Sequence, residues 1–125
     1  MKVIVAGGRN FEPNEAHETW LIEQLRSRGA SEIVCGMASG ADEFGRQTAL
    51  ELGLPVKEFP ALWGKFGAAA GPHRNIEMTT YADLCILFPG GKGTAHMHHT
   101  AEKYGLEAVV FPDDTQSTSV PANKG

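Results

Sequence analysis

The sequence predicts an α/β protein with a Rossmann-like, three-layer fold: a five-stranded parallel sheet with helices on both faces. Short apolar runs typical of buried strands alternate with helix-like segments along most of its 125 residues. Three of these runs end in glycine-containing loops that lead into the next predicted helix. Strands separated by helices pair in parallel, so the alternation predicts a sheet covered on both sides.

The first strand is predicted at residues 2–6, a β-branched run that ends at two glycines. A helix over residues 13–28 follows, with Leu21 and Leu25 one turn apart on its inner face. Gly29 is a natural stop for this helix.

The second strand is predicted at residues 32–35, and the loop of residues 36–42 leads from it into a second helix. Ser39, with Asp42 three residues later, matches a capping box. Helix capping would explain both residues without a ligand, and it is also compatible with ligand binding. Residues 55–59 form a short third strand.

A longer loop is predicted at residues 60–71, where Trp63 and Phe66 either stack on a base or form a lid on the core. The next helix is predicted to start at Pro72 or His73, which places Arg74 in its first turn. A cation there opposes the helix dipole. Such a local conflict is a reason to suspect a functional site.

The fourth strand is predicted at residues 83–88, followed by a helix over residues 95–104 and a fifth strand at residues 107–111. Between strand and helix lies Pro89-Gly90-Gly91-Lys92-Gly93-Thr94. Glycines let a backbone approach a ligand closely, and a helix start favours an anion, most often phosphate. A plain turn would normally need only one glycine.

All of the suspect loops follow the carboxyl ends of predicted strands, where open parallel sheets bind ligands. The familiar fingerprints are absent. Lys92 is followed by Gly93 rather than by Ser or Thr, so there is no Walker P-loop, and Gly7-Gly8 lacks the third glycine of the dinucleotide motif. The sequence therefore predicts a different phosphate cradle.

Length and composition limit the classes of protein to which the chain can belong. The length fits one domain, predicted at residues 1–112, and residues 113–125 lack periodicity and predict a disordered tail. A net charge of −4 argues against a broad nucleic-acid or membrane surface. With no signal peptide and no membrane span expected, we predict a cytoplasmic protein. Cys35 and Cys85 would lie about 9–10 Å apart if their strands flank a common strand, too far for a disulfide.

His96 and His99 are three residues apart on one predicted helical face, but no third metal ligand stands at a recognisable spacing. We therefore predict no metal and no other cofactor. His96, nearest the glycine cradle, is expected to touch the ligand.

Four segments together resemble a known group. They are Ala6-Gly7-Gly8-Arg9, Gly36-x-x-Ser39-Gly40-Ala41-Asp42, residues 69–78 with Arg74-Asn75, and Gly93-Thr94-Ala95-His96. The chain resembles the YspA-like branch of the SLOG superfamily over roughly residues 1–112. That superfamily also holds the Lonely-guy phosphoribohydrolases and the Smf/DprA DNA-processing proteins. The resemblance implies nucleoside monophosphates, ADP-ribose or NAD-derived signals as ligands, and Lonely-guy relatives suggest a homodimer.

The motif at residues 89–94 is similar to the Lonely-guy glycine motif, and Arg74 falls where that family carries a catalytic-site arginine. The family's glutamate is replaced by Met97. Cleavage of an N-glycosidic bond needs a carboxylate near the oxocarbenium-like centre. The candidate substitutes are Asp42, Glu43 and Glu77, with Asp42 best placed at a strand end.

We therefore expect a module that binds or senses a nucleotide or nucleotide-sugar. The rival is a hydrolase of the ligand's N-glycosidic bond, with Asp42 and Arg74 catalytic. A single-strand DNA binder of the Smf/DprA type is disfavoured by the acidic net charge. The expected ligand-binding residues are Gly7, Gly8, Arg9, Gly36, Ser39, Gly40, Arg74, Asn75, Gly90, Gly91, Gly93, Thr94 and His96.

Overall fold

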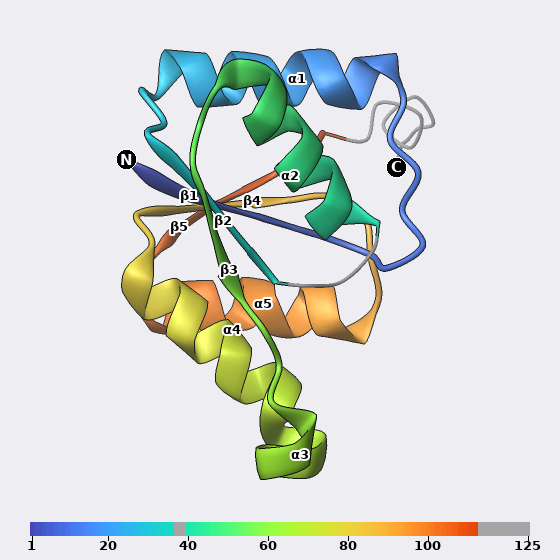
Figure 1. The fold of residues 1–125 in the computed structure, drawn as a ribbon, viewed down its shortest axis with the longest axis vertical. Helices are drawn as coiled ribbons and strands as arrows, with labels where there is room; N and C mark the ends of the chain where they lie inside the picture. Colours follow the sequence, from blue (N-terminus) through green and yellow to red (C-terminus); the bar gives the residue numbers. More distant parts are fainter. Residues whose placement is uncertain (37–39, 113–125) are drawn as a thin grey trace, which may run out of the picture.

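A computed structural model describes residues 1–36 and 40–112 of the chain. Its centre is a five-stranded, all-parallel sheet in the order β3-β2-β1-β4-β5 (Figure 1). The predicted sheet is thereby confirmed. The strands are β1 (Lys2–Ala6), β2 (Glu32–Gly36), β3 (Val56–Phe59), β4 (Leu84–Leu87) and β5 (Glu107–Val110).

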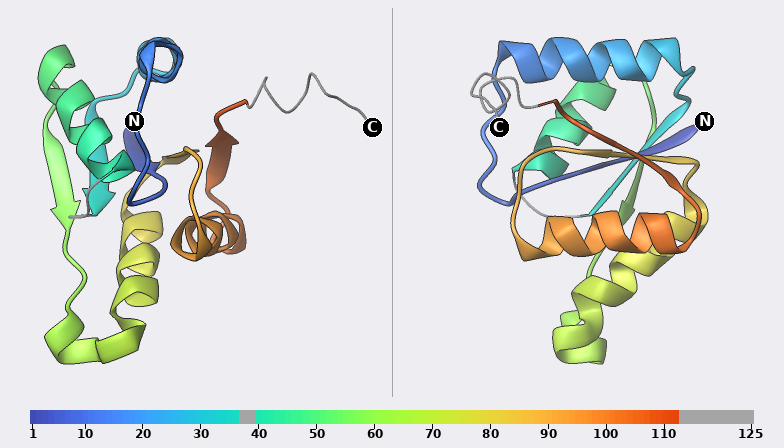
Figure 2. Two further views of the ribbon diagram at one scale, coloured as in Figure 1. Left: turned by 90° about the vertical axis from the view of Figure 1, so that its right-hand side faces the viewer. Right: turned by 180° about the vertical axis from the view of Figure 1, so that it is seen from behind.

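Helices cover both faces of this sheet, as predicted. Helices α1 (Glu15–Ser27) and α2 (Ala41–Leu52) lie on one face, and α4 (Ala70–Tyr81) and α5 (Lys92–Lys103) lie on the other (Figures 1 and 2). A short helix, α3 (Trp63–Phe66), and a 3₁₀ turn, η1 (Gly67–Ala69), project beyond the sheet and lead into α4. No helix within the described ranges has the length and apolar character needed to span a membrane.

The core consists of two clusters, one on each face of the sheet, because side chains alternate along a strand. In β1, Val3 and Val5 join the cluster under α1 and α2, whereas Ile4 and Ala6 join the cluster under α4 and α5. Val3, Ile4 and Val5 are fully buried. This continuous burial is typical of a central strand in a parallel sheet.

Phe88, directly after β4, is the hub of an aromatic group on the α1 side. Its ring centroid lies between 5.2 and 5.9 Å from those of five neighbours. These neighbours are Phe11, His17, Trp20, Phe44 and Phe111. The group therefore joins the β1–α1 loop, α1, α2 and the end of β5.

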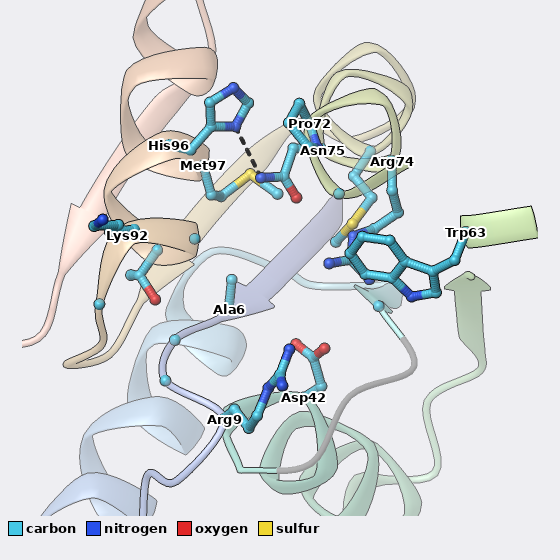
Figure 3. A pocket seen from close by; sticks show the side chains of 18 residues that line it. Ala6, Arg9, Asp42, Trp63, Pro72, Arg74, Asn75, Lys92, His96 and Met97 are labelled. Carbon is cyan, nitrogen blue, oxygen red and sulfur yellow. Dashed lines mark hydrogen bonds between the residues drawn. The ribbon is translucent and has the colours of Figure 1, made fainter. Parts of the chain in front are cut away.

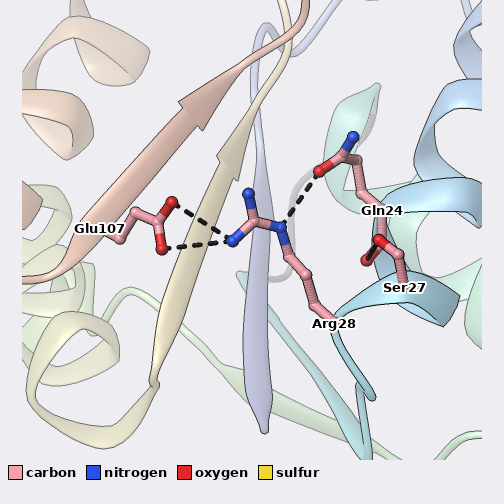
Figure 4. A network of polar contacts seen from close by, with 4 residues as sticks. All are labelled: Gln24, Ser27, Arg28 and Glu107. Carbon is pink, nitrogen blue, oxygen red and sulfur yellow. Dashed lines mark hydrogen bonds and ion pairs between the residues drawn. The ribbon is translucent and has the colours of Figure 1, made fainter.

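Helix α1 begins with a reciprocal capping box. The Asn14 side chain accepts a hydrogen bond from the His17 backbone N–H, and His17 Nδ1 accepts one from the Asn14 N–H, both at 2.9 Å. At the other end, Arg28 donates to Gln24 Oε1 at 3.1 Å and to both carboxylate oxygens of Glu107 at 3.2 Å (Figure 4). This contact ties the end of α1 to the start of β5.

Two predicted helix starts are wrong. Helix α4 begins at Ala70 rather than at Pro72 or His73, so Arg74 lies in its second turn and does not oppose the dipole at the first. Helix α5 begins at Lys92 rather than at residue 95. Gly40 is the N-cap of α2, and Asp42 is the second residue of this helix. The predicted capping box includes Ser39, which lies outside the described residues.

The two cysteines lie as predicted, in strands that flank β1, and both are free and buried. Burial raises the pKa of Cys35 and of Cys85 to about 12. Their thiolate population at neutral pH is negligible, so neither is a ready nucleophile.

Candidate functional site

The main cavity of the protein lies at the carboxyl edge of the sheet, between the ends of β1, β2 and β4. The strand order reverses there, because the chain builds outward from β1 through β2 to β3 and then continues on the other side of β1 with β4. The cavity has a volume of about 620 Å³, within the usual range for small-molecule sites. Its lining is Ala6, Gly7, Gly8, Arg9, Gly36, Asp42, Trp63, Gly71, Pro72, Arg74, Asn75, Met78, Gly91, Lys92, Gly93, Thr94, His96 and Met97 (Figure 3).

The loops after β1 and β4 are held together below this cavity. Gly8 N–H donates to the carbonyl of Pro89 at 2.8 Å. A Cβ on Gly90 would lie 2.6 Å from Gly8 N, so only glycine fits between the two loops. Gly40 has a φ of +70°, and a Cβ on it would collide with the carbonyl oxygens of Gly8 and Arg9. Gly40 and Gly90 thus close the loops against each other and do not line the main cavity.

The start of α5 opens directly into the cavity. Gly91 is its N-cap, no side chain in the described part of the chain caps it, and its first turn holds Lys92 and no acidic residue. Around the ideal Cβ positions of Gly91 and Gly93, no described atom beyond the neighbours and the helix's own backbone lies within 4 Å. Neither glycine has a positive φ. Unpaired N–H groups, a cation and open space together suit an incoming anion.

The opposite wall is formed around Gly36, at the end of β2. A Cβ there would lie 3.0 Å from both Arg74 Cζ and Asp42 Oδ2, so the guanidinium and the carboxylate are close neighbours over this glycine. Arg74 Nε is buried and has no hydrogen-bond partner among the described residues. Asp42 is 8% exposed, and Figure 3 shows the Arg9 and Asp42 side chains pointing toward each other.

A polar pair from α4 and α5 forms a third part of the lining. Asn75 Nδ2 lies 3.1 Å from His96 Nδ1 (Figure 3). Thr100 Oγ1 lies 3.3 Å from the same nitrogen. Asn75 is 7% exposed. These contacts fix the orientation of the His96 ring and leave Nε2 for another partner.

Trp63, from α3, lines the cavity on the side away from Lys92 (Figure 3). Its side chain is 57% exposed. The other aromatic residue of α3, Phe66, does not line the cavity and instead stacks on His73 at 4.2 Å between ring centroids.

The structure brings most of the predicted site residues together. Those that line the main cavity are Gly7, Gly8, Arg9, Gly36, Asp42, Arg74, Asn75, Gly91, Gly93, Thr94 and His96. Gly40 and Gly90 lie behind the wall, and Ser39 lies outside the described residues. The additional lining residues are Ala6, Trp63, Gly71, Pro72, Met78, Lys92 and Met97. Lys92 was within the glycine motif, but the predicted helix began after it.

Of the three candidate carboxylates, only Asp42 lines the cavity. Hydrogen bonds from Gln47 and Arg46 engage Glu43 and lower its pKa. Glu77 lies 3.6 Å from His73 Nδ1 on the outer side of α4. No group of histidine, cysteine and acidic residues in the described ranges could hold a metal ion.

The fold and the cavity define a doubly wound α/β protein with a cation-bearing pocket at the point where its strand order reverses. Comparison with protein-family models, with curated proteins and with solved structures finds no match for this chain.

Proposed function

We propose that this protein is a binding or sensing module for a phosphorylated, nucleotide-derived ligand such as a nucleoside monophosphate, ADP-ribose or an NAD-derived molecule. The phosphate lies at the start of α5, where the N–H groups after Gly91 and the side chains of Lys92 and Thr94 receive it. Arg74 and Arg9 supply further positive charge from the opposite walls.

The observation that carries this proposal is the start of α5. A helix normally begins with a capping side chain or an acidic residue, as α1 does with Asn14 and Glu15. Helix α5 has neither, and it places Lys92 where a cation is unfavourable in the free protein. The conflict is resolved if an anion from outside the chain supplies the missing negative charge.

Gly93→Ala tests the proposal, because alanine fits at this position in the free protein. The free energy of unfolding should rise by about 0.5–1 kcal/mol, since alanine is the better helix former. Affinity for adenosine 5′-monophosphate, measured by calorimetry, should nevertheless fall at least tenfold, because the methyl group occupies space that the phosphate needs.

Gly64→Ala is the matched control. Gly64 also lies in a helix with open space around its Cβ position, but it does not line the cavity. Its substitution should leave affinity unchanged. An unaltered affinity in Gly93→Ala, or no binding of any nucleotide by the native protein, would refute the proposal.

A second candidate function is hydrolysis of the ligand's N-glycosidic bond. The observation in its favour is Asp42, the carboxylate that lines the cavity among the three candidates. It would stabilise the oxocarbenium-like transition state and activate water, in the place of the carboxylate missing at Met97. Binding alone needs fewer assumptions, because Asp42 also orients the cations beside it.

Asp42→Asn separates the two functions. A hydrolase should release free base in the native form and lose that turnover at least a hundredfold in the variant, while keeping its affinity for the nucleotide. A binder should release no base in either form. Chromatography of nucleotide mixtures after prolonged incubation is the measurement.

A further inference from the structure

Trp63 is a large aromatic side chain placed at a cavity yet left mostly in water. It is 57% exposed and belongs to neither core cluster, so it does little for the stability of the fold. Its ring lies beside Gly71 at the cavity wall, 3.7 Å from the position that a Cβ on this glycine would occupy. An exposed indole beside a cavity is suited to contact with a flat ligand.

The cavity has two chemically different ends. Lys92 and the start of α5 lie at one end, and Trp63 lies at the other, with Arg74 beside it (Figure 3). Gly71, Pro72 and Met78 add apolar lining from α4, and Gly71 lies beside the Trp63 ring. A ligand with a phosphate at one end and an aromatic ring at the other matches this polarity, whereas a sugar phosphate leaves the Trp63 end empty.

We propose that Trp63 is the stacking platform for the base of the ligand, so that the site selects nucleotides over sugar phosphates. This inference rests on the proposed function, because it assumes that the phosphate lies at the start of α5. The base lies against the indole face, and the ribose spans the cavity past Gly36 and Arg74. The platform adds affinity through ring overlap, which every base can provide.

The two tryptophans make this testable by fluorescence. Trp20 packs against Phe88 and Phe111 on the other face of the sheet, so Trp20→Phe leaves Trp63 as the only indole without touching the cavity. In that variant, the nucleoside monophosphates of adenine, guanine, cytosine and uracil should quench the emission if their bases stack. Ribose 5-phosphate should bind without quenching.

Affinities of Trp63 variants, in the protein that retains Trp20, measure the contribution of the ring. Trp63→Leu should weaken nucleotide binding about five- to hundredfold, the range for loss of one base–aromatic stack, and leave ribose 5-phosphate unaffected. Trp63→Phe should retain part of the nucleotide affinity. Tyr104→Ala removes an aromatic ring that is also about half exposed, at 47%, but lies outside the cavity, and it should change nothing.

The possible results are distinguishable. Quenching by nucleotides alone, together with selective loss in Trp63→Leu, supports the platform. Equal affinities for nucleotides and ribose 5-phosphate, unchanged by Trp63→Leu, overturn the platform and leave the phosphate site intact. If neither nucleotides nor ribose 5-phosphate bind to the native protein, the proposals of the phosphate site and of the stacking platform are both refuted. The remaining Trp20 emission and thermal unfolding verify that each Trp63 variant is folded.

Discussion

At the scale of single residues, the glycines of this chain have three different structural roles. Gly53 and Gly40 have positive φ, which only glycine adopts readily. Gly36 and Gly90 allow close approaches within the protein, whereas Gly93 faces open space in the cavity. A sequence does not distinguish these three roles, so the predicted phosphate cradle included Gly40 and Gly90, which do not line the cavity.

Gly36→Ala should lower nucleotide affinity with little loss of stability. Its Cβ would collide with the end of the Arg74 side chain, which is flexible and can move away from the cavity. The loss of one charge-assisted hydrogen bond from Arg74 to the ligand is about 1.5–3 kcal/mol, or roughly ten- to a hundredfold in affinity. Calorimetric titration and urea unfolding of the same preparation give both quantities.

Gly45→Ala is the control for Gly36→Ala. Gly45 packs on the core side of α2, where a Cβ would lie 2.9 Å from Val5 Cβ. Overpacking there should cost about 1–3 kcal/mol of stability and leave the affinity of the folded protein unchanged. If Gly36→Ala behaved like Gly45→Ala, the assignment of Arg74 to the ligand would lose its support.

At the scale of elements, the sequence predicted the strands and the helical faces well and the helix starts poorly. The burial of Leu21 and Leu25 in α1 follows from apolar periodicity, which tertiary packing preserves. The first turns of α4 and α5 contain Gly71, Pro72 and Gly93, which are poor helix formers. Proline is tolerated in a first turn, and packing of the following turns extends both helices backwards.

The dependence of the helix starts on tertiary packing also explains why the site was only partly predictable. The residues after each strand could be placed at one edge of the sheet, because parallel strands share their direction. The distance of Trp63 and Lys92 from that edge depends on how α3 and α5 pack, which no local pattern encodes. Arg74 was placed in the site for a reason that proved wrong, its supposed first-turn position; it lines the cavity because α4 projects it over Gly36.

His17, within the capping box of α1, should make stability fall with pH below about 6.5. Burial among Phe11, Phe88 and Phe111 lowers its pKa from the ordinary value of about 6.5. The unfolded chain therefore binds a proton more readily than the folded protein does. Stability is fully present above the unfolded pKa and declines as pH falls from there toward the lower folded pKa.

His17→Gln should reduce this pH dependence. Glutamine at the third helical position keeps the capping box but does not titrate. Urea unfolding between pH 5 and 8 should give a flatter curve for the variant than for the native protein, because the other histidines contribute equally to both. Parallel curves would show that His17 titrates alike in the folded and unfolded states.

At the scale of the whole molecule, one aromatic group connects elements from both ends of the chain. Phe88 is 1% exposed and contacts the β1–α1 loop, α1, α2 and the end of β5. The bridge between Arg28 and Glu107 links α1 to β5 on the surface, where an ion pair contributes less than about 1 kcal/mol. The connection between α1, α2 and the end of β5 therefore depends more on the aromatic group around Phe88 than on this ion pair.

Phe88→Ala should cost about 3–5 kcal/mol of stability, since it leaves a cavity among five rings. Denaturant unfolding followed by the emission of Trp20, whose ring lies 5.6 Å from that of Phe88, measures the loss. Phe88→Leu keeps most of the volume and should cost less, which preserves a measurable transition if the alanine variant is unfolded. A loss below about 1 kcal/mol in Phe88→Ala would contradict this role.

The pairing of β1 with both β2 and β4 has a consequence for the order in which the chain is assembled on the ribosome. β2 emerges soon after β1, but the other edge of β1, where Ala6 pairs with Leu87, stays unpaired until β4 has been made. Until then, the wall formed by the start of α5 does not exist, and the nascent half-sheet has no pocket. A ligand that needs this wall stabilises only chains whose synthesis has passed it, so binding marks the completed protein and not its precursors.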